Sequence, residues 1–257
     1  TIAEFLQKEG YATGIFGKWH LGWIEPAQIE SRGHYSPPWH HGYEESFVTK
    51  SAVPTWNPTK TPAGWTGFGS EEDGSWGGSR YLHNGVVVTE NLDGDDSRVI
   101  MDRAIPFIEK SVKNDKPFYA TIWFHTPHEP VVAGPEYLAK YPGLPEEQQH
   151  LYGCITAMDE QIGRLMSYLE ENNLSENTII FFTSDNGPSG PITRRGIASA
   201  GPFKGTKHEV WEGGIRVPSL MQWKGHLKNG VCNSALGTVD YLPTILDILE
   251  IPQSKKA

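Results

Sequence analysis

The chain alternates between stretches with clear hydrophobic periodicity and one long stretch without it. Apolar residues at helical spacing predict helices over residues 1–9, from about Ser97 onward, along a stripe from Leu151 to Leu169, and over about 241–249. Short apolar runs predict buried strands at residues 118–124, 178–184 and 217–223, and a short strand is predicted at residues 11–16. Strands that alternate with helices favour an α/β fold, with a mostly parallel (mixed) sheet covered by helices on both faces.

Residues 23–96 break this pattern. Gly, Pro, Trp and His crowd together there, and no period of a strand or a helix persists. We interpret the region as a loop-rich, insertion-like elaboration with at most short strands; loops of this length are uncommon unless they are functional. Four of its tryptophans are either platforms for sugar rings or packing for the loops, and both interpretations stay open. They are Trp39, Trp56, Trp65 and Trp76.

Composition narrows the class of protein. The 257 residues are 37% hydrophobic, enough for one sizeable core, and no second compact domain is visible. The net charge of −9, without a basic block, argues against nucleic acid as a partner. No apolar run approaches the ~18 residues that a membrane span requires. Cys154 and Cys232 are too few for a disulfide scaffold, and two buried free thiols are favoured over one bridge.

Two segments place histidine and lysine directly after a predicted strand. In Gly10–Gly22, Lys18 and His20 stand two residues apart, so they share a side in extended backbone and suit an anion and a proton transfer. In the segment FHTPHEP, His125 and His128 follow a buried strand. His128 lies deeper in the loop, where a ligand would sit, while His125 is interpreted as either a structural or a ligand-binding histidine.

Two further segments supply oxygen ligands and cations. Asp185 and Asn186 follow the strand at 178–184, and their oxygens suit Ca²⁺ or Mg²⁺, although Asp-Asn-Gly is also an ordinary turn sequence. Lys204 and Lys207 precede a Gly213-Gly214 turn at which the backbone can approach a ligand closely. The alternative for this last segment is a charged surface hairpin.

The four segments, in this order, resemble the type I sulfatases of the alkaline-phosphatase superfamily. GYATGIFGKWHLG resembles the second sulfatase signature, FHTPHEP the family's histidine loop, SDNG its metal-binding pair, and KHEVWEGGIRVP its lysine-to-Glu-Gly-Gly segment. The resemblance spans Thr1 to about Ile251, with little contribution from residues 23–96. It implies an alkaline-phosphatase-like sulfatase core that hydrolyses sulfate esters, and it makes residues 1–257 a partial catalytic domain.

The resemblance also implies roles for single residues. Asp185 and Asn186 match two ligands of a Ca²⁺ ion, with Mg²⁺ as the alternative. Lys18 and His20 match the pair that contacts the formylglycine and the sulfate. His128 matches the sulfate-binding histidine near the leaving oxygen, and Lys207 matches the sulfate-binding lysine, because it stands five residues before Glu212. His208 replaces the glycine that is usual after that lysine, and is a candidate for contact with the substrate.

One departure from the family pattern concerns the nucleophile. The family makes its formylglycine from Cys or Ser in a C/S-x-P/A-x-R motif, and neither Cys232 nor Ser189 begins such a motif. We therefore expect an internal fragment whose nucleophile segment and paired aspartates lie upstream of Thr1, and which is inactive alone. The expected substrate is a sulfated carbohydrate, acted on outside the cytoplasm or in lysosomes. A phosphodiesterase or phosphonate hydrolase of the same superfamily and a non-catalytic sulfated-glycan-binding relative remain alternatives.

Overall fold

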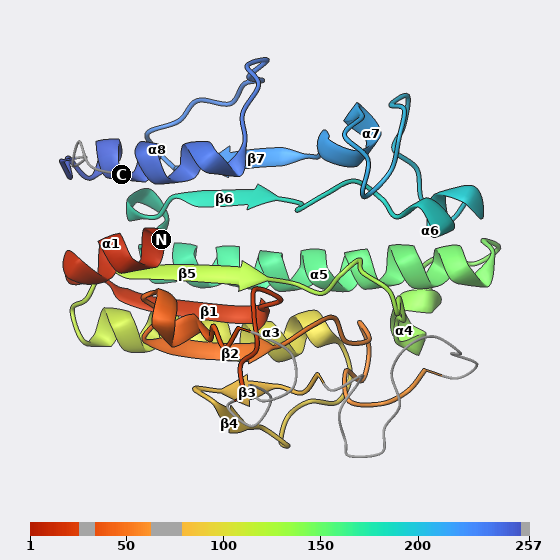
Figure 1. Cartoon of the computed structure of the whole chain (residues 1–257), viewed down its shortest axis with the longest axis horizontal. Helices are drawn as coiled ribbons and strands as arrows, with labels where there is room; N and C mark the ends of the chain where they lie inside the picture. The colour runs from red at the N-terminus through yellow and green to blue at the C-terminus, as the bar shows by residue number, and fades with distance from the viewer. Residues whose placement is uncertain (26–33, 63–78, 253–257) are drawn as a thin grey trace.

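The computed structural model describes residues 1–25, 34–62 and 79–252, which form two β-sheets with helices around them (Figure 1). The larger sheet has the strand order β4-β3-β2-β1-β5. Its strands β1 (Ala12–Lys18), β2 (Glu45–Thr49) and β5 (Phe118–Trp123) are parallel, and the hairpin β3 (Leu82–His83) and β4 (Val86–Val87) is antiparallel. The smaller sheet pairs β6 (Ile180–Thr183) with β7 (Ser219–Gln222) in antiparallel fashion. The mixed sheet and the α/β class confirm the predicted fold.

Helices cover both faces of the larger sheet because neighbouring strand residues point to opposite sides. On one side, Phe16 and Phe47 lie in the core cluster of α3 (Asp96–Lys113), where Phe16 meets Phe107 with ring centroids 5.5 Å apart. On the other side, Ile15 and Val48 share a cluster with residue Ala3 of α1 (Ile2–Lys8). The long helix α5 (Glu146–Glu171) lies alongside α3 (Figure 1).

The remaining elements are short. They are η2 (Pro38–His41), α4 (Pro135–Leu138), η3 (Ser175–Asn177), α6 (Gly190–Arg194), α7 (Glu212–Ile215), η4 (Thr238–Asp240) and α8 (Tyr241–Ile248). Among the described residues, no helix has the length and the apolar character needed to cross a membrane.

Local sequence explains where the helices begin. Thr1 and Glu4 form a capping box, so α1 starts where the periodicity predicts. The expected cap of α3 was Ser97, but Asp95 is the capping residue, and its side chain accepts a hydrogen bond from the backbone of Arg98. Aspartate caps a helix as well as serine does, so the helix begins two residues earlier than expected.

Several elements differ in burial from what the sequence predicts, while the five-residue strand β2 is one of the short strands that residues 23–96 were expected to allow. The strand β2, inside the region read as irregular, is a core strand between β1 and β3. The strands β5 and β6 are half-buried rather than fully buried, and β7 is exposed. The reason is topological: β5 is an edge of the larger sheet, and β6 and β7 form a separate two-stranded sheet. Cys154 and Cys232 are both free, as predicted, but Cys232 is exposed.

The four tryptophans proposed as sugar platforms or loop packing differ in their surroundings. Trp56 packs against Tyr137 and Ala133 and lies directly over Gly134, whose absent Cβ would stand 2.2 Å from its ring. This supports the packing interpretation for Trp56. Trp39 is 37% exposed, so both interpretations stay open for it. Trp65 and Trp76 lie outside the described residues.

Candidate functional site

The end of β1 carries the first two candidate residues. Gly17 has φ +110°, a conformation that glycine adopts readily, and it lets β1 and β5 come close together just before Lys18. Trp19 is 3% exposed, stacks on Trp123 with ring centroids 6.0 Å apart, and donates its indole N–H to the carbonyl of Ser36. Because Trp19 points into the core, Lys18 is left half-buried and His20 exposed at the carboxyl end of the sheet.

The histidine loop follows β5 and separates its two histidines. His125 is 1% exposed and is held by Asp96 and Thr49, which identifies it as structural. The Nδ1 atom of His128 lies 2.6 Å from the carbonyl oxygen of Glu129. A carbonyl oxygen only accepts, so Nδ1 carries the proton and donates it. In the neutral ring, Nε2 of His128 therefore keeps a lone pair for a substrate atom.

The loops after β6 and before α7 are locked together by their backbones. Gly187 donates to the carbonyl of Gly214 at 2.9 Å, and a Cβ on Gly187 would stand 1.9 Å from the carbonyl oxygen of Gly213. The amide of Lys207 donates to the carbonyl of Pro188 at 2.9 Å. Asp185 and Lys207 are thereby fixed relative to each other although 22 positions separate them in the sequence.

Electrostatic interactions link these separate segments. Burial lowers the pKa of Lys18; the charge of Lys207 lowers it further, and that of Asp185 acts in the opposite direction. Burial also lowers the pKa of His20, with smaller contributions from Lys18 and Lys207. For His128, burial again is the main cause of a lowered pKa, and both lysines contribute. Because such interactions fade with distance, Lys18, His20, His128 and Lys207 lie within electrostatic range of one another, and Asp185 within range of Lys18.

Asn186 and His208 complete the set of predicted residues. The side-chain amide of Asn186 donates from its nitrogen to the carbonyl of Gly187, which leaves its oxygen as the atom for a ligand. His208 is exposed with φ 77°, so it keeps a glycine-like conformation at the position where the related motif has glycine. Its contact with a substrate stays a prediction.

The described residues do not supply a full set of ligands for a divalent cation. Asp185 and Asn186 offer oxygen atoms of suitable chemistry, but Ca²⁺ takes about six to eight oxygen ligands. Within residues 1–25, 34–62 and 79–252, no group of three or more His, Cys, Asp or Glu side chains is arranged to hold a metal. On these residues alone, the metal site is incomplete.

Sequence reasoning missed Lys50, which follows β2 as Lys18 ends β1. Its carbonyl oxygen accepts the amide hydrogen of His20 at 2.9 Å, and its charge is among the causes that lower the pKa of His20. Its ammonium lies 3.3 Å from the ring centroid of Trp23. No motif marks Lys50; only the parallel pairing of β1 with β2 places it here.

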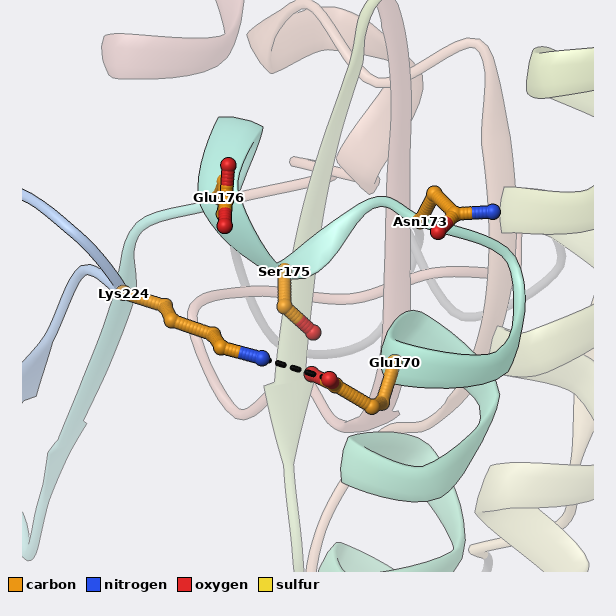
Figure 2. A pocket seen from close by; sticks show the side chains of 5 residues that line it. All are labelled: Glu170, Asn173, Ser175, Glu176 and Lys224. Atoms are coloured by element: carbon orange, nitrogen blue, oxygen red, sulfur yellow. Dashed lines mark hydrogen bonds and ion pairs between the residues drawn. The ribbon is translucent and has the colours of Figure 1, made fainter.

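Two hollows of the surface are lined by residues other than these candidates. Figure 2 shows a polar hollow between Glu170, the turn after α5, and Lys224, where Lys224 pairs with Glu170. It lies near the first residue of β6, whereas the candidate residues lie at or after the carboxyl ends of strands. The second hollow is a shallow groove of about 600 Å³ between α5 and the chain after α6.

Comparison with known proteins identifies the family. The model of the family described as Sulfatase matches residues 1–251. The chain belongs to the sulfatase family. This sulfatase chain is 30% identical to an arylsulfatase of Hemicentrotus pulcherrimus over 96% of its own length and 42% of that protein. It is 28% identical to the N-acetylgalactosamine-6-sulfatase of Homo sapiens, covering 100% of the chain and 46% of the relative.

Solved structures give the same fold. The crystal structure of Ps i-CgsB in complex with k-i-k-neocarrahexaose superposes with a TM-score of 0.81 at 26% identity, covering 99% of this chain and 54% of that one. The sulfatase chain thus spans about half the length of the relatives that it matches.

Proposed function

We propose that the protein containing this chain hydrolyses sulfate esters of a carbohydrate. The observation that carries the proposal is the cluster of Lys18, His20, His128, Asp185 and Lys207, drawn from four separate segments of a sulfatase-family chain. A sulfate ester is anionic, and fixed cations in a partly buried site stabilise the charge of the transferring group.

Each cation and histidine has a task that fits its environment. Lys18 and Lys207 bind the sulfate oxygens. His128 offers Nε2 towards the leaving oxygen; its pKa is lowered in the absence of a ligand, and a bound anion raises it again, so the imidazole gains a proton as the substrate binds. That proton can then pass to the departing alcohol. His20 contacts the sulfate from the end of β1, and His208 contacts the sugar.

Two components of the chemistry go beyond the residues of this chain. The nucleophile is proposed to be a formylglycine made from Cys or Ser of a C/S-x-P/A-x-R motif, which none of the 257 residues form. Asp185 and Asn186 are proposed to contribute two ligands to a Ca²⁺ or Mg²⁺ ion, whose remaining ligands come from elsewhere in the protein. Calcium titration by calorimetry tests this role: Asp185→Ala should weaken binding at least tenfold in the complete protein.

The sulfate-binding role is best tested with two neighbouring lysines. Lys207→Met removes the proposed sulfate contact, whereas Lys204→Met removes a lysine whose ammonium lies 4.0 Å from the ring centroid of Trp211. Removing one preorganised charge at the transferring group should lower kcat/KM by about 10²- to 10³-fold. The matched variant should change it by less than about threefold. Equal effects of the two substitutions would refute the assignment of Lys207.

The proposed substrate class is tested by measuring activity on a panel of substrates. The names of two matched proteins, an N-acetylgalactosamine-6-sulfatase and a structure holding a neocarrahexaose, support a sulfated saccharide. The complete protein should therefore release sulfate from sulfated saccharides faster than from an aryl sulfate. Activity on the aryl ester alone would count against a carbohydrate. Hydrolysis of a phosphodiester in preference to every sulfate ester, or binding without turnover, would replace the proposed reaction by one of its alternatives.

A further inference from the structure

A buried polar network lies directly beneath the candidate site. Its members are Asp96, at the start of α3, His125, at the end of β5, Thr49, at the end of β2, and Tyr81. All four are at most 1% exposed. Buried polar side chains are costly unless they are hydrogen-bonded, so such a network demands an explanation beyond packing.

The hydrogen bonds assign the protons of His125. The Thr49 hydroxyl lies 2.7 Å from the carbonyl oxygen of Ser51, which only accepts, so the single hydroxyl proton goes there. Towards Nε2 of His125, at 2.8 Å, the Thr49 oxygen must therefore accept. It follows that Nε2 carries a proton.

A second proton lies between His125 and Asp96. Nδ1 of His125 stands 2.7 Å from one carboxylate oxygen of Asp96, and the hydroxyl of Tyr81 donates to the other oxygen at 2.6 Å. The Tyr81 hydrogen bond and the helix N-terminus both stabilise the anionic form of Asp96. The shared proton consequently sits on Nδ1, and His125 is an imidazolium ion opposite a carboxylate.

The network is connected to the segments after β1 and β5, which carry His20 and His128. The backbone carbonyl of His125 accepts the amide hydrogen of His128 at 2.6 Å. The carbonyl of Thr49 accepts from Trp19, and that of the following residue, Lys50, accepts from His20, both at 2.9 Å. The side-chain network therefore ties the end of β2 to the segment after β5, across the end of β1, while its backbone hydrogen bonds hold the segments of His20 and His128.

We propose that Asp96 and His125 form a buried ion pair that acts as a positioning device for Lys18, His20 and His128. The inference rests on the proposed function for its kinetic consequences, although not for the charge state of His125. Besides Asp96, the charged or titratable groups near the pair are Asp95 and Tyr81 on one side and His128 on the other.

The first test is spectroscopic and does not depend on activity. In ¹⁵N NMR spectra of the complete protein at pH 7–8, both nitrogens of His125 should show the shifts of a protonated imidazolium. Asp96→Asn should abolish that signature and move the imidazole resonances of His20 and His128. Ser111→Ala, which removes a buried hydroxyl that donates to the Phe107 carbonyl farther along α3, should leave all three unchanged. A neutral His125 in the unsubstituted protein would overturn the proposal.

The second test is kinetic. A displacement of reacting groups by about 1 Å costs about 100-fold in rate, so Asp96→Asn should lower kcat about 10- to 100-fold with a much smaller change in KM. If that variant does not fold, Thr49→Val should lower kcat in the same way, and Thr49→Ser, which keeps the hydroxyl, should restore it. Kinetics of Asp96→Asn and Thr49→Val equal to those of Ser111→Ala would overturn the positioning role. An unsubstituted protein that hydrolyses no sulfate ester would refute the proposed function and leave the NMR result to decide the ion pair.

Discussion

Gly17 lies where two strand backbones approach closely, and Gly17→Ala makes the energetic cost of a side chain at that position measurable. A Cβ there would stand 1.9 Å from the carbonyl oxygen of Trp123, its partner in the β1–β5 ladder. The positive φ alone costs an alanine about 1–2 kcal/mol. Relief of the overlap requires the two strands to separate, with about 1–3 kcal/mol of packing strain and about 0.5–1.5 kcal/mol for each ladder hydrogen bond lost.

The expected loss in the free energy of unfolding is therefore about 3–6 kcal/mol, a large part of the total stability of a domain. Gly10→Ala is the matched control, because Gly10 has φ +87° and no atom within 4 Å of the added Cβ. It should lose only about 1–2 kcal/mol. Urea unfolding of both variants measures the difference. If Gly17→Ala proves no more destabilising than Gly10→Ala, the close approach of β1 and β5 beside Lys18 is wrong.

Three other outcomes follow from burial and charge. Burial raises the pKa of the Asp95 carboxyl to about 7, so its protonated form stabilises the fold fully below pH about 4 and this contribution is lost as the pH rises to about 7. Asp95→Asn, which keeps a capping side chain, should accordingly raise the free energy of unfolding at pH 8 by up to about 4 kcal/mol and leave it unchanged at pH 4; equal effects at both values would contradict this. Burial raises the pKa of the Cys154 thiol to about 12, whereas Cys232 is exposed with a lowered pKa, so a thiol reagent at pH 7.5 should label Cys232 and spare Cys154 in mass spectra of the native protein. Inorganic sulfate should raise the pKa of His128 followed by NMR, and Lys207→Met should weaken that effect; an unchanged titration would argue against anion binding beside His128.

The periodic parts of the chain were predictable from sequence. Helices α1, α3, α5 and α8 and strands β1, β5 and β6 appear within a few residues of their expected bounds, because each buries a side that its hydrophobic spacing marks, and β7 also appears near its expected bounds although it is exposed. The strand β2 was not predictable in this way. Its sequence ESFVT is short and surrounded by Gly, Pro, Trp and His, and its status as a core strand comes from long-range pairing with β1 and β3.

The residues of the candidate site also fall into those that the sequence could identify and those that only the fold reveals. Lys18, His128 and Asp185 follow strands, and the carboxyl ends of strands are where ligands gather in such sheets, so short motifs could identify them. Lys50 and Thr49 had no motif, because they reach the site only through the pairing of β2. The role of His125 also required the fold, since its partner Asp96 is 29 residues away on the opening turn of a helix.

The cluster of like charges is itself an argument for an anionic ligand. The charge of Lys207 is among the causes that lower the pKa of Lys18, and both lysines act in the same direction on His20 and His128. In the free protein this arrangement is destabilising, because like charges that share a partly buried region are screened less than on an open surface. The surrounding structure holds them there nonetheless: Gly17 fixes the end of β1, and the backbone bond from Lys207 to Pro188 fixes the second loop. An anion that enters between the two lysines relieves the repulsion. This relief contributes favourably to the free energy of anion binding.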